Sequence, residues 1–88
     1  MIPTPAPQIV THIVDEEALL LDTASQKIHH LNGTARVIWE LCEIGSTVEK
    51  IVFEFIQIYE VDEQTARRDI EHTLSSWVEM GLIAPTPE

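Results

Sequence analysis

Residues 27–39 read Lys-Ile-His-His-Leu-Asn-Gly-Thr-Ala-Arg-Val-Ile-Trp, and the hydrophobic pattern changes period inside this stretch. The first five residues have the length and composition of a short β-strand. On such a strand Lys27, His29 and Leu31 share one face, and Ile28 and His30 share the other. Beyond it the pattern becomes helical, with Asn32 or Thr34 available as the N-cap. The residues on the apolar stripe of that helix are Ala35, Ile38, Trp39 and Cys42.

Two more strands are predicted before this stretch. Ile9–Val14 is rich in β-branched residues, and Ala18–Asp22 is an apolar run of strand length. An acidic turn over residues 15–17 and a polar loop over residues 23–26 separate the three segments. Because both connections are short, the three strands are expected to form an antiparallel meander.

Two more helices are predicted after it. Gly45 is placed to end the first helix in a left-handed conformation, and Ser46-Thr-Val-Glu49 reads as a capping box that begins the second. Asp62 is the expected cap of the third helix, and Gly81 is its expected end. The apolar stripe of the second helix is Val48, Ile51, Val52, Phe55, Ile56 and Tyr59. That of the third is Ala66, Ile70, Leu74, Trp77 and Val78.

Together these elements predict an α+β fold of the winged helix-turn-helix type. Its N-terminal three-stranded antiparallel sheet must bury one face, and the three helices that follow are the available cover. We expect one domain over residues 9–83. The prolines of residues 1–8 predict a flexible arm, and residues 84–88 are expected to form a C-terminal tail.

Composition narrows the classes of function. Fifteen acidic residues against five basic ones give a formal charge of −10, which argues against binding to nucleic acid or to anionic lipid. No apolar run approaches the roughly 18 residues of a membrane span, and the N-terminus lacks the pattern of a secretory signal. With a single cysteine and no disulfide framework, a cytoplasmic location is expected.

The sequence offers little for catalysis. His29 and His30 are adjacent on a strand, so their side chains point to opposite faces and do not readily bind one metal ion. Cys42 lies on an apolar helical stripe near a helix C-terminus, which favours a buried thiol over a nucleophile. There is no phosphate-binding loop, nucleophile elbow or paired-carboxylate motif. We therefore predict a protein without catalytic residues, cofactor or metal.

With these kinds of site excluded, an open strand edge is the remaining candidate for a binding site. An outer strand of a three-stranded sheet has unpaired amides and carbonyls, to which an extended peptide can add as a further strand. This edge serves as a binding site if the third strand lies beside a helix, but a sheet edge can equally be covered or simply exposed.

The chain resembles the PqqD-like family over Ala18–Ile83, about three quarters of its length. The resemblance rests on the order and spacing of several short segments. These are Leu19-Leu-Leu-Asp22, Leu31-Asn-Gly-Thr-Ala35, Ile38-Trp39, Thr47-Val-Glu-Lys-Ile51, Tyr59-Glu-Val-Asp62, Ala66-Arg-Arg-Asp-Ile70 and Met80-Gly-Leu-Ile83.

The resemblance implies a recognition element that binds the leader of a ribosomally synthesised precursor peptide. The leader would pair with the third strand, lie against the third helix and be delivered to a maturation enzyme. That enzyme is a radical S-adenosylmethionine protein in some pathways and a leader peptidase with a cyclase in lasso-peptide pathways. The implied peptide-binding residues are Lys27, Ile28, His29, His30, Leu31, Ala66, Arg67, Ile70, Glu71, Thr73 and Leu74.

Two departures distinguish this chain from proteins of the quinone pathway. Those tend to carry Pro-Glu-Gly before the third strand, where this chain has Thr23-Ala-Ser-Gln26, and Asp-Gly after the first helix, where it has Glu43-Ile-Gly45. The sequence is closer to the stand-alone modules of lasso-peptide clusters. A peptide chaperone for a radical S-adenosylmethionine enzyme is the alternative.

A winged-helix transcription regulator is a further alternative, and charge separates it from peptide binding. The third predicted helix offers only Arg67 and Arg68 against several carboxylates. In a gel-shift assay at low salt we expect no retardation of double-stranded DNA. A shift that weakens as salt is raised would instead favour a regulator.

Overall fold

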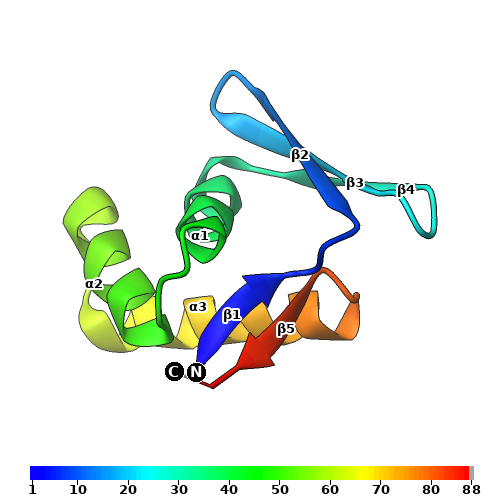
Figure 1. Ribbon diagram of the computed structural model, residues 1–88. Coiled ribbons are helices and arrows are strands. Elements are labelled where there is room, and N and C mark those ends of the chain that lie inside the picture. The colour runs from blue at the N-terminus through cyan, green and yellow to red at the C-terminus, as the bar shows by residue number, and fades with distance from the viewer. Residues whose placement is uncertain (88) are drawn as a thin grey trace.

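The computed structural model describes residues 1–87 and contains two small sheets and three helices (Figure 1). The elements in chain order are β1 (Ile2–Pro5), β2 (Ile9–Val14), β3 (Glu17–Asp22), β4 (Lys27–Leu31), α1 (Gly33–Glu43), α2 (Val48–Tyr59), α3 (Glu63–Glu79) and β5 (Ile83–Thr86). Strands β2, β3 and β4 form an antiparallel sheet in that order. This confirms the predicted α+β fold, with a three-stranded sheet followed by three helices.

The two ends of the chain differ from the prediction. In place of a flexible arm and a tail, β1 and β5 pair as an antiparallel ribbon, with Pro3 opposite Pro85. The Ala6 N–H donates to the Leu82 carbonyl at 2.9 Å, which sets the alternation of the ladder. In this alternation Pro3, Pro5 and Pro85 all lie at positions where the backbone nitrogen points away from the partner strand. No ladder hydrogen bond is lost to them, so proline content did not preclude strand formation. Of the predicted tail, Glu88 lies outside the described residues.

Side-chain caps set the helix starts. The Asn32 carboxamide accepts the Ala35 N–H at 2.9 Å, so Asn32 and not Thr34 is the cap of α1. The Asp62 carboxylate accepts the Thr65 N–H at 3.0 Å, as predicted. The predicted cap of α2 is wrong by one residue, because the Thr47 hydroxyl accepts the Lys50 N–H at 3.1 Å. Ser46 instead belongs to the end of α1, where its N–H donates to the Leu41 carbonyl.

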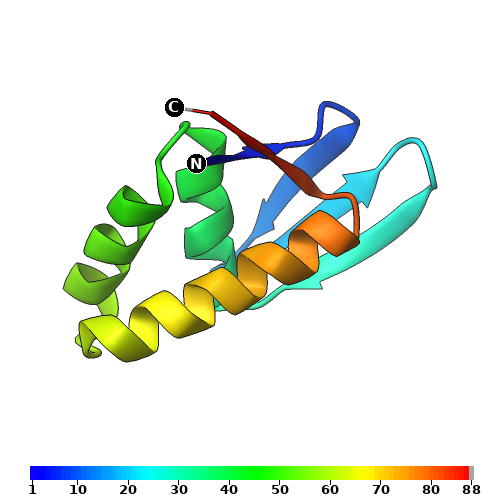
Figure 2. The same ribbon diagram turned by 90° about the horizontal axis from the view of Figure 1, so that it is seen from below.

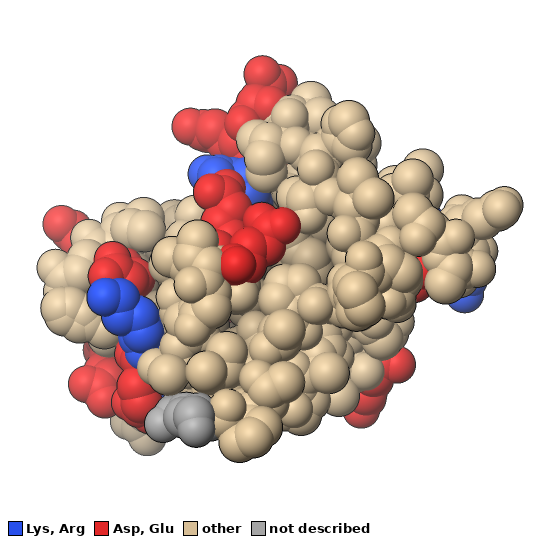
Figure 3. All heavy atoms as spheres, in the orientation of Figure 1, with Lys and Arg blue, Asp and Glu red and all other residues tan. Residues whose placement is uncertain are grey.

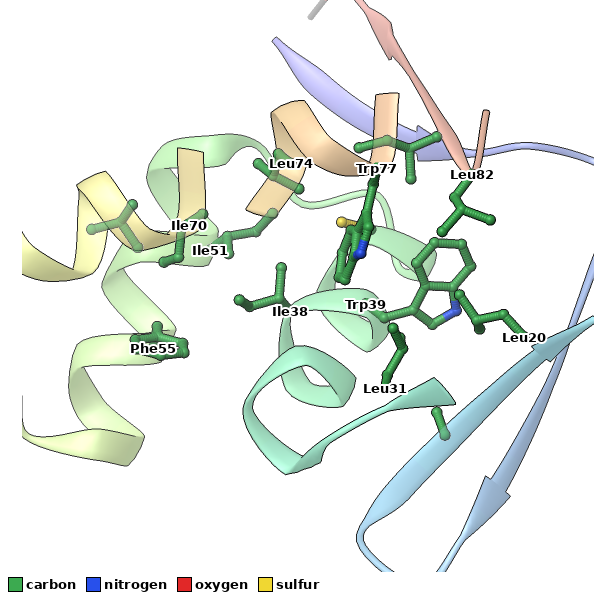
Figure 4. Packing of buried hydrophobic residues seen from close by; sticks show 14 of the residues in the cluster. Leu20, Leu31, Ile38, Trp39, Ile51, Phe55, Ile70, Leu74, Trp77 and Leu82 are labelled. Carbon is green, nitrogen blue, oxygen red and sulfur yellow. The ribbon is translucent and has the colours of Figure 1, made fainter. Parts of the chain in front are cut away.

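The core lies between the inner face of the three-stranded sheet and the helices, with Trp39 of α1 near its centre (Figure 4). Trp39 is fully buried and meets Trp77 of α3 edge to face, with ring centroids 5.5 Å apart. Its indole N–H donates to the Thr11 hydroxyl of β2 at 2.9 Å. Trp39 therefore joins α1, α3 and the sheet.

The end of α3 completes this core. Leu82 folds back so that its N–H donates to the Trp77 carbonyl at 2.9 Å, and its side chain is fully buried. Gly81 allows this return because its φ is +74°. Val78, which was predicted to lie on the buried stripe, is 40% exposed, because its side of α3 turns toward the surface.

Replacing Pro3 with Asp tests whether β1 belongs to the folded domain. Pro3 is fully buried, so a carboxylate there should lower the free energy of unfolding by about 2 kcal/mol or more. Thr4→Asp is the matched control, since Thr4 is the exposed neighbour in the same strand and should change stability by about 0.5 kcal/mol or less. Urea denaturation measures both. Equal, small effects would mean that residues 1–5 do not contribute to the fold.

Candidate functional site

Strand β4 has one open edge, and the hydrogen bonds identify the groups exposed on it. The Thr23 N–H donates to the Gln8 carbonyl at 3.0 Å, so the backbone of Thr23 and of alternate residues before it faces β2. The intervening residues of β3 face β4, where Leu20 is aligned with His29. Ile28 and His30 therefore direct their N–H and C=O groups away from β3, toward the open edge.

The other strand edges are not equivalent to this one. Both edges of the β1–β5 ribbon are interrupted by prolines whose nitrogens point outward and cannot donate. Strand β2 also has an open edge, at which the same alternation exposes the backbone groups of Ile9, Thr11 and Ile13. Within residues 1–87, two edges can thus accept a further strand without a proline in the way.

The turn before β4 holds that strand in register. The Asp22 carboxylate accepts the N–H groups of Ala24 and Ser25 at 2.9 and 3.2 Å, and the Asp22 carbonyl accepts the Gln26 N–H at 2.7 Å. Gln26 closes the turn in the left-handed region, with φ of +63°. The hydrogen bond from the Ser25 N–H is the main cause that holds the pKa of Asp22 below its usual range.

Four of the site residues implied by the family resemblance lie in the core. Ala66 and Ile70 are fully buried, Leu74 is 3% exposed and Leu31 is 5% exposed. They support the surface from beneath and do not line it in this structure. Three residues of the apolar stripe of α3, namely Ala66, Ile70 and Leu74, were assigned to peptide binding, whereas they pack inside the protein itself.

Two other predicted residues face α2 and the N-terminus. The Arg67 guanidinium makes two hydrogen bonds to the Glu49 carboxylate of α2, both 2.8 Å long, and these hold the pKa of Glu49 below its usual range. Glu71 lines a hollow that also includes Met1 and Val48. In this structure Arg67 is engaged within the protein and is not directed toward β4.

Thr73, which is half-buried, lies on the opposite side of α3. In Figure 2 β4 lies toward that side of α3, away from the N-terminus, while Figure 1 shows β4 at the upper right and α3 along the bottom of the molecule. At 100° per residue, the same side of α3 carries three residues that the sequence did not single out. They are Asp69, Ser76 and Met80. Their helical phase was readable from the sequence, but the side on which β4 would lie was not.

We call the candidate site the β4–α3 surface. It consists of Lys27, Ile28, His29 and His30 on the strand and Asp69, Thr73, Ser76 and Met80 on the helix. His29 is half-buried on the inner face of β4, whereas Ile28 and His30 are exposed on the outer face. The hollow that includes Arg67, the one that includes Met1 and the one that includes Val14 are each lined without residues from both β4 and α3. The β4–α3 surface thus combines an open strand edge with the side of α3 that lies toward it in Figure 2.

The described residues show no metal-binding group of three or more His, Cys, Asp or Glu side chains. Cys42 is 1% exposed, and burial raises the pKa of its thiol to about 12. A thiol of this kind is a poor nucleophile near neutral pH. No helix between residues 1 and 87 has the length and apolar character to cross a bilayer.

Comparison with protein families supplies the identification. The family model described as coenzyme PQQ synthesis protein D (PqqD) matches residues 17–83, which is most of the chain. The chain belongs to the PqqD family. The predicted resemblance is thereby confirmed. Among curated proteins, no sequence matches this PqqD-family chain significantly.

Two solved structures match almost the whole chain. TbiB1 in complex with the TbiA(β) leader peptide has a TM-score of 0.90 and 26% sequence identity, covering 97% of this chain and 99% of TbiB1. Lasso peptide synthetase B1 complexed with its leader peptide has a TM-score of 0.87 and 28% identity, covering 97% and 100%. The second is described as a lasso-peptide protein, which is the class that the sequence favoured over the quinone pathway.

The lowered pKa of Asp22 predicts how the stability of the protein changes with pH. Its pKa is depressed by folding, so its contribution to stability is present above its unfolded pKa of about 3.9 and is lost as pH falls through the folded value. Asp22→Asn should therefore be less stable than the parent at pH 6, and this difference should shrink below about pH 4. Urea midpoints between pH 6 and pH 2 test this, and a pH-independent difference would contradict it.

Proposed function

We propose that this PqqD-family chain binds an extended segment of the leader of a ribosomally synthesised precursor peptide. The segment adds as a fourth strand to β4 and lies against α3. The observation that carries the proposal is the open edge at Ile28 and His30, on a fold that matches two leader-bound proteins over 97% of its length.

Backbone pairing accounts for binding without a preformed pocket. Each of Ile28 and His30 offers one N–H and one C=O to the incoming strand, so two leader residues can each exchange two hydrogen bonds with β4. Leader side chains that point inward meet His29 and the facing side of α3, including the half-buried Thr73. Those inner contacts provide specificity, while the backbone bonds provide affinity that depends little on sequence.

The chain acts in this proposal as a non-catalytic carrier that needs no cofactor. It delivers the bound precursor to a maturation enzyme in the cytoplasm, where the precursor is made. The similarity to a lasso peptide synthetase B1 favours a leader peptidase with its cyclase as that enzyme. A radical S-adenosylmethionine enzyme is the alternative, which the family's description as a quinone-synthesis protein supports.

A proline at position 30 tests strand addition directly. His30→Pro removes an outward N–H without breaking a bond between β3 and β4, so the fold should persist. It should weaken leader binding about tenfold, through the lost hydrogen bond and the leader carbonyl left without a partner. Fluorescence anisotropy with labelled 15-residue peptides, tiled across the precursor encoded beside this gene, measures the affinity.

Ile13→Pro is the matched control on the other open edge. Ile13 is exposed and its N–H also points outward, but from β2. Leader affinity should be unchanged in this variant. A loss in Ile13→Pro but not in His30→Pro would move the peptide to β2. The absence of binding to any tiled peptide by the unaltered protein would refute leader binding itself.

A further inference from the structure

The outer face of the three-stranded sheet carries an apolar row that ends at the open edge of β4. Val10, Leu21 and Ile28 are aligned across β2, β3 and β4, and all three point away from the core. They are 44%, 38% and 66% exposed, respectively. The row crosses the whole sheet, and its most exposed member lies at the edge proposed to accept the leader.

The exposure of Ile28 reflects a missing neighbour. Leu21 has a strand on each side, whereas Ile28 has one only on the side of β3. Charged residues, prolines or bulges usually protect an exposed strand edge. This chain has prolines on the edges of the β1–β5 ribbon, yet it keeps the β-branched apolar residue Ile28 on the β4 edge. Such a side chain packs favourably against an apolar cross-strand partner.

We infer that the leader places an apolar side chain directly opposite Ile28, on the outer face of the sheet. This inference rests on the proposed strand addition. Because the N–H and C=O of Ile28 both face the open edge, the leader residue opposite it can exchange both backbone bonds. The side chain of that residue then lies on the same face as Ile28 and extends the apolar row by one position.

The next outward position of the leader meets a different environment. It lies opposite His30, whose Nε2 is 2.6 Å from the Glu17 carboxylate. The β4 edge therefore selects an apolar leader residue opposite Ile28. The leader residue two positions away lies beside the polar pair of His30 and Glu17. This selection from the outer face is separate from the contacts that inward-pointing leader residues make with α3.

A double-mutant cycle tests the assignment of Ile28. The tightest-binding 15-residue segment of the tiled precursor is substituted with Val and with Ser at each position, one position at a time. The unaltered protein (the parent) and its variants Ile28→Thr and Val10→Thr are each titrated with every peptide. At one leader position the parent should bind the Val peptide about two- to five-fold more tightly than the Ser peptide.

Ile28→Thr should remove that preference at this position alone. Val10→Thr, at the far end of the same row, should retain it. Circular dichroism melting of both variants checks that they remain folded. The pair is matched because each variant replaces an exposed β-branched apolar residue on the outer face with threonine.

Each other outcome overturns the inference in a distinguishable way. If the parent binds no segment, the proposed function fails and this inference fails with it. If the parent binds but no preference depends on Ile28, only the inference fails. Dependence on Val10 alone would assign the leader to β2. A concentration-dependent dimer that Ile28→Thr abolishes would mean that a second copy of the chain occupies the edge.

Discussion

The side chain of Trp39 joins parts of the fold that are far apart in sequence. It lies edge to face with Trp77 of α3, and its indole N–H bonds to Thr11 of β2. Around it are Leu20, Leu31 and Leu82, which come from the sheet and from the return after α3 (Figure 4). A large aromatic side chain buried in this way supplies much apolar contact and, through its N–H, one directed bond. The placement of β4 relative to α3 depends on this junction.

Backbone hydrogen bonding separates the edges of the two sheets. In the β1–β5 ribbon every proline occupies a position whose nitrogen points outward, so the ladder is intact and both edges are interrupted. In the larger sheet Ile28 and His30 leave donors and acceptors unpaired at the β4 edge. Since an open edge attracts other strands, it is a hazard unless it is used. The proposed leader complex uses the β4 edge.

Charge has a secondary role in this site. Figure 3 shows acidic side chains at the upper and left parts of the molecule, with most of the face over the β1–β5 ribbon uncharged. Arg36, Lys50 and Arg67 each lie beside a glutamate of the chain itself. Arg67, which the family resemblance placed among the peptide-binding residues, instead bonds to Glu49 of α2. Strand pairing and apolar contact therefore carry the proposed complex, and Lys27 is the basic residue that the β4–α3 surface offers to a leader carboxylate.

The sequence by itself determined the three-stranded meander, the three helices, the cap at Asp62 and the family, because these follow from local periodicity, capping chemistry and ordered motifs. It did not determine the β1–β5 ribbon, whose pairing joins residues more than 75 positions apart. Nor did it determine which side of α3 faces β4, so Ala66, Ile70 and Leu74 were assigned to a surface although they are buried. Only the tertiary structure decided these points, because an amphipathic stripe shows that a helix buries one face but not which element lies against each side of it.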